Sequence, residues 1–349
     1  MKKIMLSHGG GGEEMNSLIN ETIFKIFDNE ILRESNDSAI LNFSDLCTDE
    51  SDKCSANLKP KFNGKLAFST DSFVVTPIFF NGGDIGKIAA CGTINDLAMV
   101  GASAKYLSCS LIIEEGLSIE ELERVLGSLA KTCKESGVSV VCGDTKVVPK
   151  GKCDKIFINT AGIGEIVCEG VELKNLKAGA KILISGDVGR HGGVVLAARE
   201  EFELGLDLKS DCKSLKEVVL KLFSAGIKPQ TMRDATRGGL SAVLNEWAKF
   251  SKFDILVFEE NIKVADEVMG VCELFGFEPY ELANEGTFVM AVDESQAEDA
   301  LKILREFDKN AMIIGKVMEA KNERVIIENA YKSRRFLEQP KGELLPRIC

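Results

Sequence analysis

The sequence contains little histidine and lacks the runs that mark several classes of protein. Only two histidines, His8 and His191, occur among the 349 residues, so we expect no metal centre built from histidines. No apolar run reaches the length of a membrane span, and Met1-Lys2-Lys3 leads directly into a glycine-rich polar stretch. We therefore expect a cytoplasmic protein with no signal peptide and no membrane segment.

The charge balance and the cysteine spacing argue against two further classes. The net charge at pH 7 is −11 and no long basic run stands out, which argues against a nucleic-acid-binding protein. Eleven cysteines are present, but none are spaced as C-x-x-C, and most stand among small or apolar residues. Such a pattern predicts buried free thiols in a reducing cytosol rather than disulfides or a zinc site. The length and the 45% hydrophobic content predict a globular protein of two domains.

The most unusual stretch is the end of the chain, Leu344-Leu345-Pro346-Arg347-Ile348-Cys349. Gly342 frees the backbone and Pro346 interrupts regular structure, so residues 336–349 are predicted to form a flexible tail. Fully extended, such a tail spans roughly 45 Å. The terminal thiol could then reach a site elsewhere as a tethered nucleophile or substrate. The alternative is a frayed end whose cysteine is accidental.

Residues 1–38 are predicted to form a glycine-rich loop and a helix. Gly9, Gly10, Gly11 and Gly12 precede a segment with helical spacing that begins at Glu13. Backbone N–H groups of such a loop can wrap a phosphate, although a flexible linker would have the same composition.

Residues 39–165 are predicted to form an α+β domain. Apolar, β-branched stretches predict strands at 39–47, 66–75, 106–113, 138–146 and 157–164. Helices are predicted at 85–100, which is apolar on all sides, and from the capping box at Ser118 to residue 136. The predicted order of elements is β-β-α-β-α-β-β.

Three aspartates stand in apolar surroundings within this domain. Asp71 lies inside a predicted strand, Asp96 lies in the apolar helix, and Asp144 ends a strand two residues before Lys146. A buried carboxylate is costly unless it is paired or binds a cation. We therefore expect these three aspartates to bind Mg²⁺, which takes a few protein oxygens and completes its shell with phosphate oxygens. The alternative for each is a purely structural role.

Residues 166–335 are predicted to form a second, α/β domain. It contains a second glycine-rich turn near His191 that leads into a helix, and further helices are predicted at 215–223, after Leu240 through Trp247-Ala248, and at 294–307. Strands are predicted at 181–185, 254–262, 287–292, 311–318 and 324–329. The motif that includes Asp234 and Arg237 offers a guanidinium fork for phosphates, or it braces a helix N-terminus. Together with the glycine-rich loops and the aspartates, it predicts an enzyme that uses ATP.

Four motifs resemble the superfamily of aminoimidazole ribonucleotide synthetase (PurM-like), which also holds selenophosphate synthetase and thiamine-phosphate kinase. They are Asn95-Asp96-Leu97-Ala98, Gly143-Asp144-Thr145-Lys146, Asp234-Ala235-Thr236-Arg237-Gly238-Gly239 and Asn284-Glu285-Gly286. The histidine and four glycines of residues 8–12 and the terminal Pro-Arg-Ile-Cys resemble the HypE family of hydrogenase maturation proteins within that superfamily. The likeness covers essentially the whole chain. It departs at Arg190, where the family often has aspartate, and at Ala235, where we expect proline, so those two loops are expected to differ in detail.

The resemblance implies a two-domain fold and a homodimer that pairs the N-terminal sheets, with ATP and Mg²⁺ bound beside them. It implies that Cys349 receives a carbamoyl group from the carbamoyltransferase HypF. ATP then drives dehydration to an S-cyanide, and the cyanide passes to iron on the HypC–HypD scaffold for a [NiFe]-hydrogenase. Lys146 and Glu285 are the implied catalytic groups beside Cys349.

Two alternatives remain: another enzyme of the superfamily, which makes selenophosphate or phosphorylates a small amine, and a non-catalytic docking scaffold. Selenophosphate synthetase would need a reactive cysteine in its N-terminal glycine-rich loop, and residues 7–15 contain none. The purine-synthesis enzyme of the superfamily has no reason to end in an exposed Pro-Arg-Ile-Cys. A non-catalytic docking scaffold would have no need to bury acids.

Overall fold

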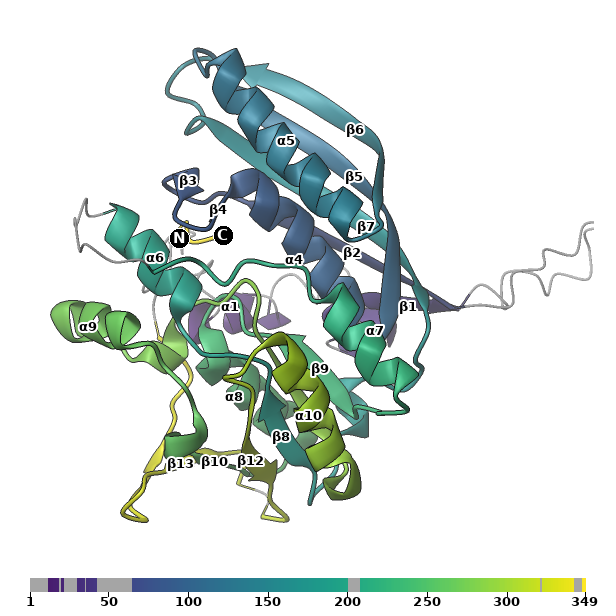
Figure 1. Cartoon of the computed structure of the whole chain (residues 1–349), viewed down its shortest axis with the longest axis vertical. Helices are drawn as coiled ribbons and strands as arrows, with labels where there is room; N and C mark the ends of the chain where they lie inside the picture. Colours follow the sequence, from purple (N-terminus) through teal and green to yellow (C-terminus); the bar gives the residue numbers. More distant parts are fainter. Residues whose placement is uncertain are drawn as a thin grey trace, which may run out of the picture.

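The chain folds into two units, each built on one β-sheet with helices packed against it (Figure 1). The computed structural model describes residues 12–18, 20–21, 30–34, 36–42, 65–199, 208–320, 322–341 and 347–349. The first unit holds a five-stranded sheet and the second a seven-stranded sheet.

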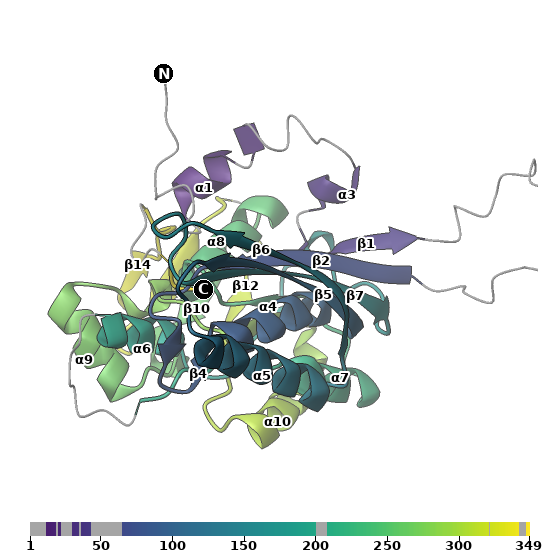
Figure 2. The same cartoon turned by 90° about the horizontal axis from the view of Figure 1, so that it is seen from above.

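The first sheet has the strand order β1-β2-β7-β5-β6. Strands β5 and β6 run parallel and are joined by α5, whereas the other neighbouring pairs are antiparallel. Helices α4 and α5 lie against one face of this sheet (Figure 2). The elements are β1 (Ala39–Asn42), β2 (Lys65–Phe73), α4 (Ile85–Met99), β5 (Ala102–Glu114), α5 (Ile119–Glu135), β6 (Ser139–Val148) and β7 (Ile156–Ile166).

Helix α4 lies at the centre of the molecule. Asp84 caps its N-terminus by accepting hydrogen bonds from Gly86 N at 2.8 Å and Lys87 N at 3.0 Å. All of its residues except Lys87 and Asp96 are buried. It packs against β2, β7 and α5 on one side, and on the other against β9 (Thr231–Asp234) and α7 (Lys216–Ser224) of the second unit. A helix that is apolar on all sides must be covered on all sides, which is why it joins the two units.

The second sheet has the order β14-β13-β10-β12-β8-β11-β9. Trp247 of α8 packs into the core on one face, and α7 and α10 cover the other face through Leu222 and Leu304. The elements are β8 (Lys181–Ile184), α7 (Lys216–Ser224), β9 (Thr231–Asp234), α8 (Gly239–Ser251), β10 (Ile255–Phe258), β11 (Phe288–Val292), α10 (Ala297–Phe307), β12 (Met312–Val317), β13 (Val325–Glu328) and β14 (Arg334–Phe336).

Several short elements complete the fold. Helix α6 (Arg190–Arg199) packs against α9 (Asp266–Phe275), and the hairpin of β3 (Phe79–Phe80) and β4 (Gly83–Asp84) leads into α4. Helices α1 (Glu13–Leu18) and α3 (Glu30–Arg33) belong to the N-terminal segment. Single 3-10 turns occupy Leu173–Asn175, Glu259–Asn261, Pro279–Glu281 and Glu294–Gln296.

The predicted order of elements in the first unit is confirmed, with the β3–β4 hairpin added before α4. Three features of the second unit were not predicted: β9, α9 and β14. The strand predicted at 254–262 is shorter, because residues 259–261 form a 3-10 turn after β10. Of the strand predicted at 39–47, residues 39–42 form β1 and the rest lies outside the described residues.

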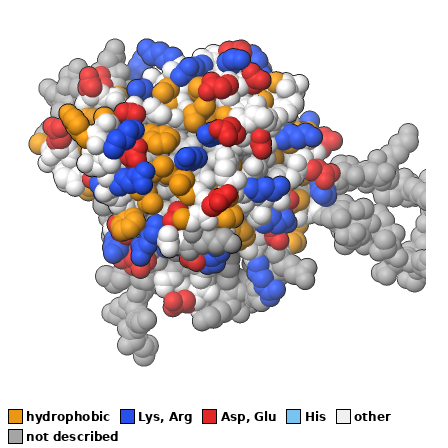
Figure 3. All heavy atoms as spheres, turned by 90° about the horizontal axis from the view of Figure 1, so that it is seen from below, with side chains coloured by type: hydrophobic (Ala, Val, Ile, Leu, Met, Phe, Trp, Pro, Cys, Tyr) orange, Lys and Arg blue, Asp and Glu red, His pale blue; other side chains and the backbone are white. Residues whose placement is uncertain are grey.

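The molecular surface shows no single dominant sign of charge in the view of Figure 3, where basic, acidic and apolar side chains are interspersed. Among the residues that the structure describes, no helix is both long enough and apolar enough to cross a membrane.

Candidate active site

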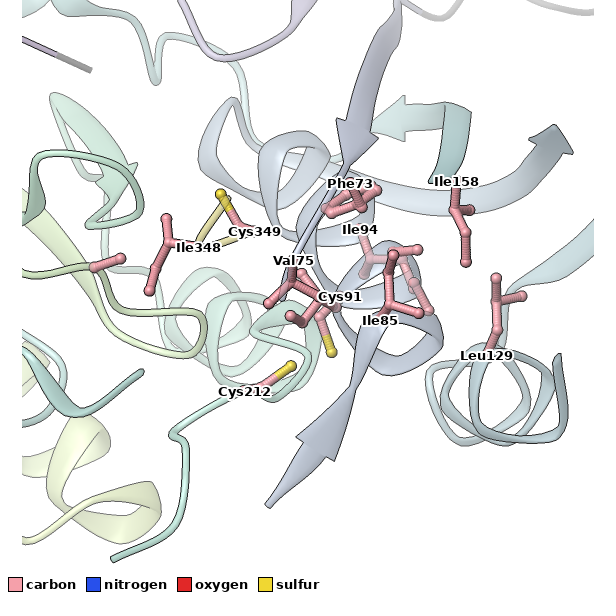
Figure 4. Close-up of a cluster of buried hydrophobic side chains, with 14 of the residues drawn as sticks. Phe73, Val75, Ile85, Cys91, Ile94, Leu129, Ile158, Cys212, Ile348 and Cys349 are labelled. Carbon is pink, nitrogen blue, oxygen red and sulfur yellow. The ribbon is translucent and has the colours of Figure 1, made fainter. Parts of the chain in front are cut away.

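The last three residues of the chain lie between the two units, where the C-terminus is marked in Figure 1. They run alongside the segment that follows β2. Val74 N donates to Cys349 O at 3.0 Å, and Thr76 N donates to Arg347 O at 3.1 Å. Ile348 and Cys349 join the apolar cluster around α4 (Figure 4), and only 8% of Cys349 is exposed. The predicted flexibility of the tail is therefore not confirmed for its end, which is docked inside the protein.

His191, in α6, holds the tail from the second unit. Its Nε2 lies 2.8 Å from Ile348 O, and its Nδ1 lies 2.8 Å from Ser210 Oγ. Burial lowers the pKa of His191 and favours the neutral ring. Because a carbonyl oxygen can only accept, Nε2 carries the proton and Nδ1 accepts from Ser210. The sequence placed His191 in a glycine-rich turn but gave no sign of this contact.

Three carboxyl groups gather where α4 meets the two sheets. Asp71 lies on β2, Asp96 on α4, and Asp234 at the end of β9. Burial and then the charges of Asp234 and Asp71 raise the pKa of Asp96 well above its usual range, although Ser69 Oγ donates to it at 2.7 Å. Burial likewise raises the pKa of Asp234 and of Asp71. Carboxyl groups that raise one another's pKa in this way form a site that attracts a cation.

Arg237 lies in the turn between β9 and α8 and supplies positive charge to this cluster. Its Nη2 is 3.9 Å from Asp71 Oδ1. Its electrostatic interaction with the acidic group of Cys349, and then with those of Asp71 and Glu285, raises the pKa of Arg237 against the opposing effect of burial. Arg237 is therefore close to the terminal thiol as well as to the carboxyl groups.

Glu285 lies in the loop before β11 and is buried, and its Oε1 has no hydrogen-bond partner among the described residues. Burial, followed by Cys212 and Asp234, raises its pKa well above the usual range. A carboxyl group of this kind is an effective proton acceptor once it is ionised.

Asp211 holds the loop that carries Glu285, a role that no sequence pattern predicts. Its carboxylate accepts from Glu285 N at 3.1 Å, from Gly286 N at 3.0 Å and from Asn284 Nδ2 at 3.0 Å. The backbones approach so closely here that a Cβ added to Gly286 would lie 1.9 Å from Asp211 O. Glycine is therefore required at this position.

The thiol of Cys349 is kept protonated by its surroundings. Burial raises its pKa strongly, Arg237 opposes this effect, and the charges of Glu285, Asp71 and Asp234 add to it. The docked thiol is therefore a poor nucleophile. The docked position therefore suits a Cys349 sulfur that was modified before the tail docked.

Asp144 and Lys146 lie elsewhere within the chain. They stand on β6 opposite Ser110 and Ile112 of β5, on the face of the first sheet that is turned away from α4 and α5. We call this the outer face; its exposed apolar side chains are Phe68, Tyr106, Ile112 and Ile163. Lys146 Nζ bonds to Asp144 Oδ2 at 2.5 Å, and both side chains are exposed. By contrast, Asp71 faces α4, because it pairs with Thr160, whose Oγ1 donates to Ala89 O of that helix.

One chain alone therefore brings together Cys349, Glu285, Arg237, Asp71, Asp96 and Asp234 but does not bring Asp144 and Lys146 to them. Gly12 is buried at the start of α1, and Gly9, Gly10 and Gly11 lie outside the described residues.

A divalent cation would fit the carboxyl cluster only with oxygen ligands from another molecule. Within the described ranges, no three His, Cys, Asp or Glu side chains are close enough to hold a metal ion by themselves. Mg²⁺ commonly takes one or two carboxylates and completes its shell with water and phosphate oxygens. Asp71 and Asp96 match that requirement, because each is relieved of its neighbours' repulsion when a cation binds.

Comparison with known proteins finds relatives of the same family as the sequence motifs, and they match along the full length of the chain. Residues 51–166 match the family model of the N-terminal domain of AIR synthase related proteins, and residues 177–328 match that of the C-terminal domain. The carbamoyl dehydratase HypE of Escherichia coli (strain K12) is 42% identical over 355 residues, with 100% of each chain covered.

Two solved structures resemble the chain closely. A HypE–HypF complex has a TM-score of 0.81 at 41% identity and covers 93% of this chain and 100% of that one. HypE in complex with ATP has a TM-score of 0.78 at 40% identity and covers 99% of this chain and 100% of that one.

Proposed function

Because the chain belongs to the HypE family of carbamoyl dehydratases, we propose that it converts a carbamoyl group on its own Cys349 into a cyanide, using ATP. The observation that carries this proposal is the docked C-terminus, which buries the Cys349 sulfur among Glu285, Arg237 and Asp71. A substrate attached to the chain reacts intramolecularly, which lowers the barrier by up to about 7–11 kcal/mol in the best cases.

The reaction requires two bond-breaking steps at the carboxamide. The carboxamide oxygen first attacks the γ-phosphorus of ATP, so ADP leaves and one N–H proton is lost. The C–O bond then breaks, phosphate leaves with the electron pair, and the second N–H proton is removed. The product is the thiocyanate S–C≡N. In total, the carbamoyl group and ATP are converted into the bound cyanide, ADP and phosphate.

Arg237 and Glu285 have different roles in these steps. Arg237 offers N–H donors to the charge that develops on the carboxamide oxygen and on the phosphoryl group. Glu285 accepts a proton from the carboxamide nitrogen, and its raised pKa makes its ionised form a stronger base than an exposed carboxylate. Asp211 holds Glu285 in position by binding its backbone N–H.

Asp71 and Asp96 would hold Mg²⁺ together with the phosphates of ATP, and Asp234 and Arg237 would contact the nucleotide. When bound, the cation would neutralise charge on the phosphates during transfer. The glycines at 9–12, ahead of α1, are proposed to cover the phosphates.

We propose a homodimer that forms through the outer face of the first sheet. Phe68, Tyr106 and Ile163 are neighbours across β2, β7 and β5, and Ile112 lies farther along β5 on the same face. Exposed apolar side chains that gather on one face of a sheet are typical of an interface. Asp144 and Lys146 share this face, so pairing two outer faces would carry them to the neighbouring chain. The partner subunit's Lys146 then joins Glu285 as the second proton-transfer group, and the partner subunit's Asp144 joins the metal and nucleotide site.

The partners follow from the relatives. A HypE–HypF complex supports HypF as the carbamoyltransferase that modifies Cys349. The HypC–HypD scaffold is proposed to receive the cyanide on iron, in the cytoplasm. The nine cysteines that the structure describes are all free, which suits a reducing compartment.

The test is the mass of the C-terminal peptide after incubation with HypF, carbamoyl phosphate and ATP. The proposed activity requires a carbamoyl adduct on Cys349 that loses one water only when this protein is supplied with ATP. An unmodified Cys349 under every condition would refute the proposal and would favour phosphorylation of a separate small molecule.

A further inference from the structure

Arg347 is held by a site built from the first unit. Its Nη1 donates to Asp154 Oδ2 at 2.6 Å, and its Nε donates to Val74 O at 3.0 Å. The guanidinium group lies over the ring of Phe157, 5.7 Å from the ring centroid. Asp154 stands in the loop between β6 and β7 and also accepts from Thr76 Oγ1 at 3.3 Å. The side chain next to the reactive end is thus recognised by charge, by a carbonyl and by an aromatic face.

The backbone of Arg347 is fixed from the opposite side. Arg199, at the end of α6, donates through Nη2 to Arg347 O at 3.0 Å and to Thr76 O at 3.1 Å. One guanidinium therefore bridges the tail and the strand-like segment beside it. Because Arg347 is only two residues from the terminal cysteine, fixing it also fixes the sulfur.

The docked position is incompatible with modification by another protein. Cys349 is 8% exposed, and its neighbour Ile348 is also buried. A carbamoyltransferase must enclose the thiol that it modifies, so the tail has to leave this position to be loaded and return to be dehydrated. Undocking separates Arg347 from Asp154.

We propose that the ion pair of Arg347 and Asp154 is a clasp that sets how Cys349 divides its time between the docked position and the position in which it is loaded. Asp154 is a positioning residue that acts through Arg347 and touches no reacting atom. This inference rests on the proposed function, because it assumes that the docked thiol is the one dehydrated.

A clasp has a consequence that an ordinary structural contact does not have. Weakening it raises the fraction of undocked tails, so carbamoylation becomes faster, while dehydration of the loaded tail becomes slower. Loss of folding would slow both reactions.

The first test measures the exposure of Cys349 without ATP or partner proteins. The protein is treated briefly with iodoacetamide, digested with a protease that cuts after glutamate, and the alkylated fraction of peptide 344–349 is measured by mass. The side chains of Arg347 and Asp154 are 32% and 49% exposed, so water and salt screen their attraction. We expect Asp154→Ala and Arg347→Ala each to raise the alkylation rate about two- to fivefold.

The double variant and a neighbouring ion pair provide the controls. If the two residues act as one clasp, Asp154→Ala combined with Arg347→Ala raises the rate no further than Arg347→Ala alone. Lys155, which follows Asp154 in the same loop, pairs with Glu121 of α5 at 3.0 Å and at similar exposure. Lys155→Gln breaks that ion pair and should leave alkylation unchanged. Unchanged alkylation in both single variants, additive effects in the double variant, or an equal effect of Lys155→Gln would overturn the clasp.

The second test separates the clasp from the proposed chemistry. With HypF and ATP supplied, Asp154→Ala should load Cys349 faster and dehydrate it more slowly than the unaltered protein. Slower loading in Asp154→Ala would contradict the clasp. If alkylation changes as expected but no variant, nor the unaltered protein, dehydrates a loaded tail, the clasp stands and the proposed function fails.

Discussion

Replacing Asp211 by asparagine, a side chain of nearly the same size, perturbs the loop that positions Glu285. The carboxylate accepts three hydrogen bonds, from Glu285 N, Gly286 N and Asn284 Nδ2. Asparagine keeps one acceptor oxygen, which can serve two of these donors. Its amide NH₂ must then face the third, so one hydrogen bond is lost and two donors confront each other.

The expected cost follows from these contacts. A hydrogen bond to a charged group contributes about 1.5–3 kcal/mol, and the loop is partly buried, so water cannot fully replace it. If about 2–3 kcal/mol of this loss appears as misplacement of Glu285, dehydration slows roughly 30- to 150-fold. The charge of Asp211 also helps to raise the pKa of Glu285. Removing this charge lowers that pKa, so the rise of the rate with pH should shift to lower pH.

The assay is the loss of water from carbamoylated Cys349, followed by mass at several pH values. Asp293→Asn is the matched control, because Asp293 also accepts hydrogen bonds in a turn of the second unit. That turn is exposed and carries none of the proposed site residues. Chemical denaturation reports the stability of both variants. An Asp211→Asn protein that dehydrates at the normal rate, with an unshifted pH profile, would refute the role assigned to Asp211.

Three further predictions concern the base, the acid cluster and the dimer. Glu285→Gln should leave the midpoint of urea unfolding nearly unchanged, because the raised pKa already favours the neutral form, yet it should slow dehydration at least about 100-fold. The pKa values of Asp96 and Asp234 are raised in the folded protein, so the folded state binds more protons than the unfolded one and stability falls as pH rises through those values. Mg²⁺ with ATP should therefore raise the melting temperature more at pH 8 than at pH 6, and a shift independent of pH would contradict the site. Ile112→Glu, on the outer face, should convert a dimer into monomers in light scattering, whereas unchanged mass would place the interface elsewhere.

Much of the fold is predictable because hydrophobic patterns are local. The all-apolar sequence of α4 predicts a helix covered on every side, and the capping box at Ser118 predicts where α5 begins; both agree with the structure. Helix α9 escaped prediction although its apolar residues Val268, Val271 and Cys272 have helical spacing. That spacing is the signal that would have found it.

The assembly of the site is less predictable because it depends on contacts between distant segments. Asp71 and Asp144 look alike in the sequence, because each is an acidic residue in a predicted strand. A strand alternates its faces at every residue, so sequence alone does not reveal that one faces α4 and the other faces away. Asp211, in a loop, and His191, in α6, contact segments that come close only in the folded chain, and no local pattern marks either contact.

The most direct test of the central claim follows the carboxamide oxygen. Cys349 is loaded with a carbamoyl group that carries ¹⁸O, the protein is supplied with ATP in ordinary water, and the released phosphate is analysed by mass. If the docked carboxamide is activated by phosphorylation, one ¹⁸O atom appears in phosphate for each thiocyanate formed. Thiocyanate formed with unlabelled phosphate would contradict that account.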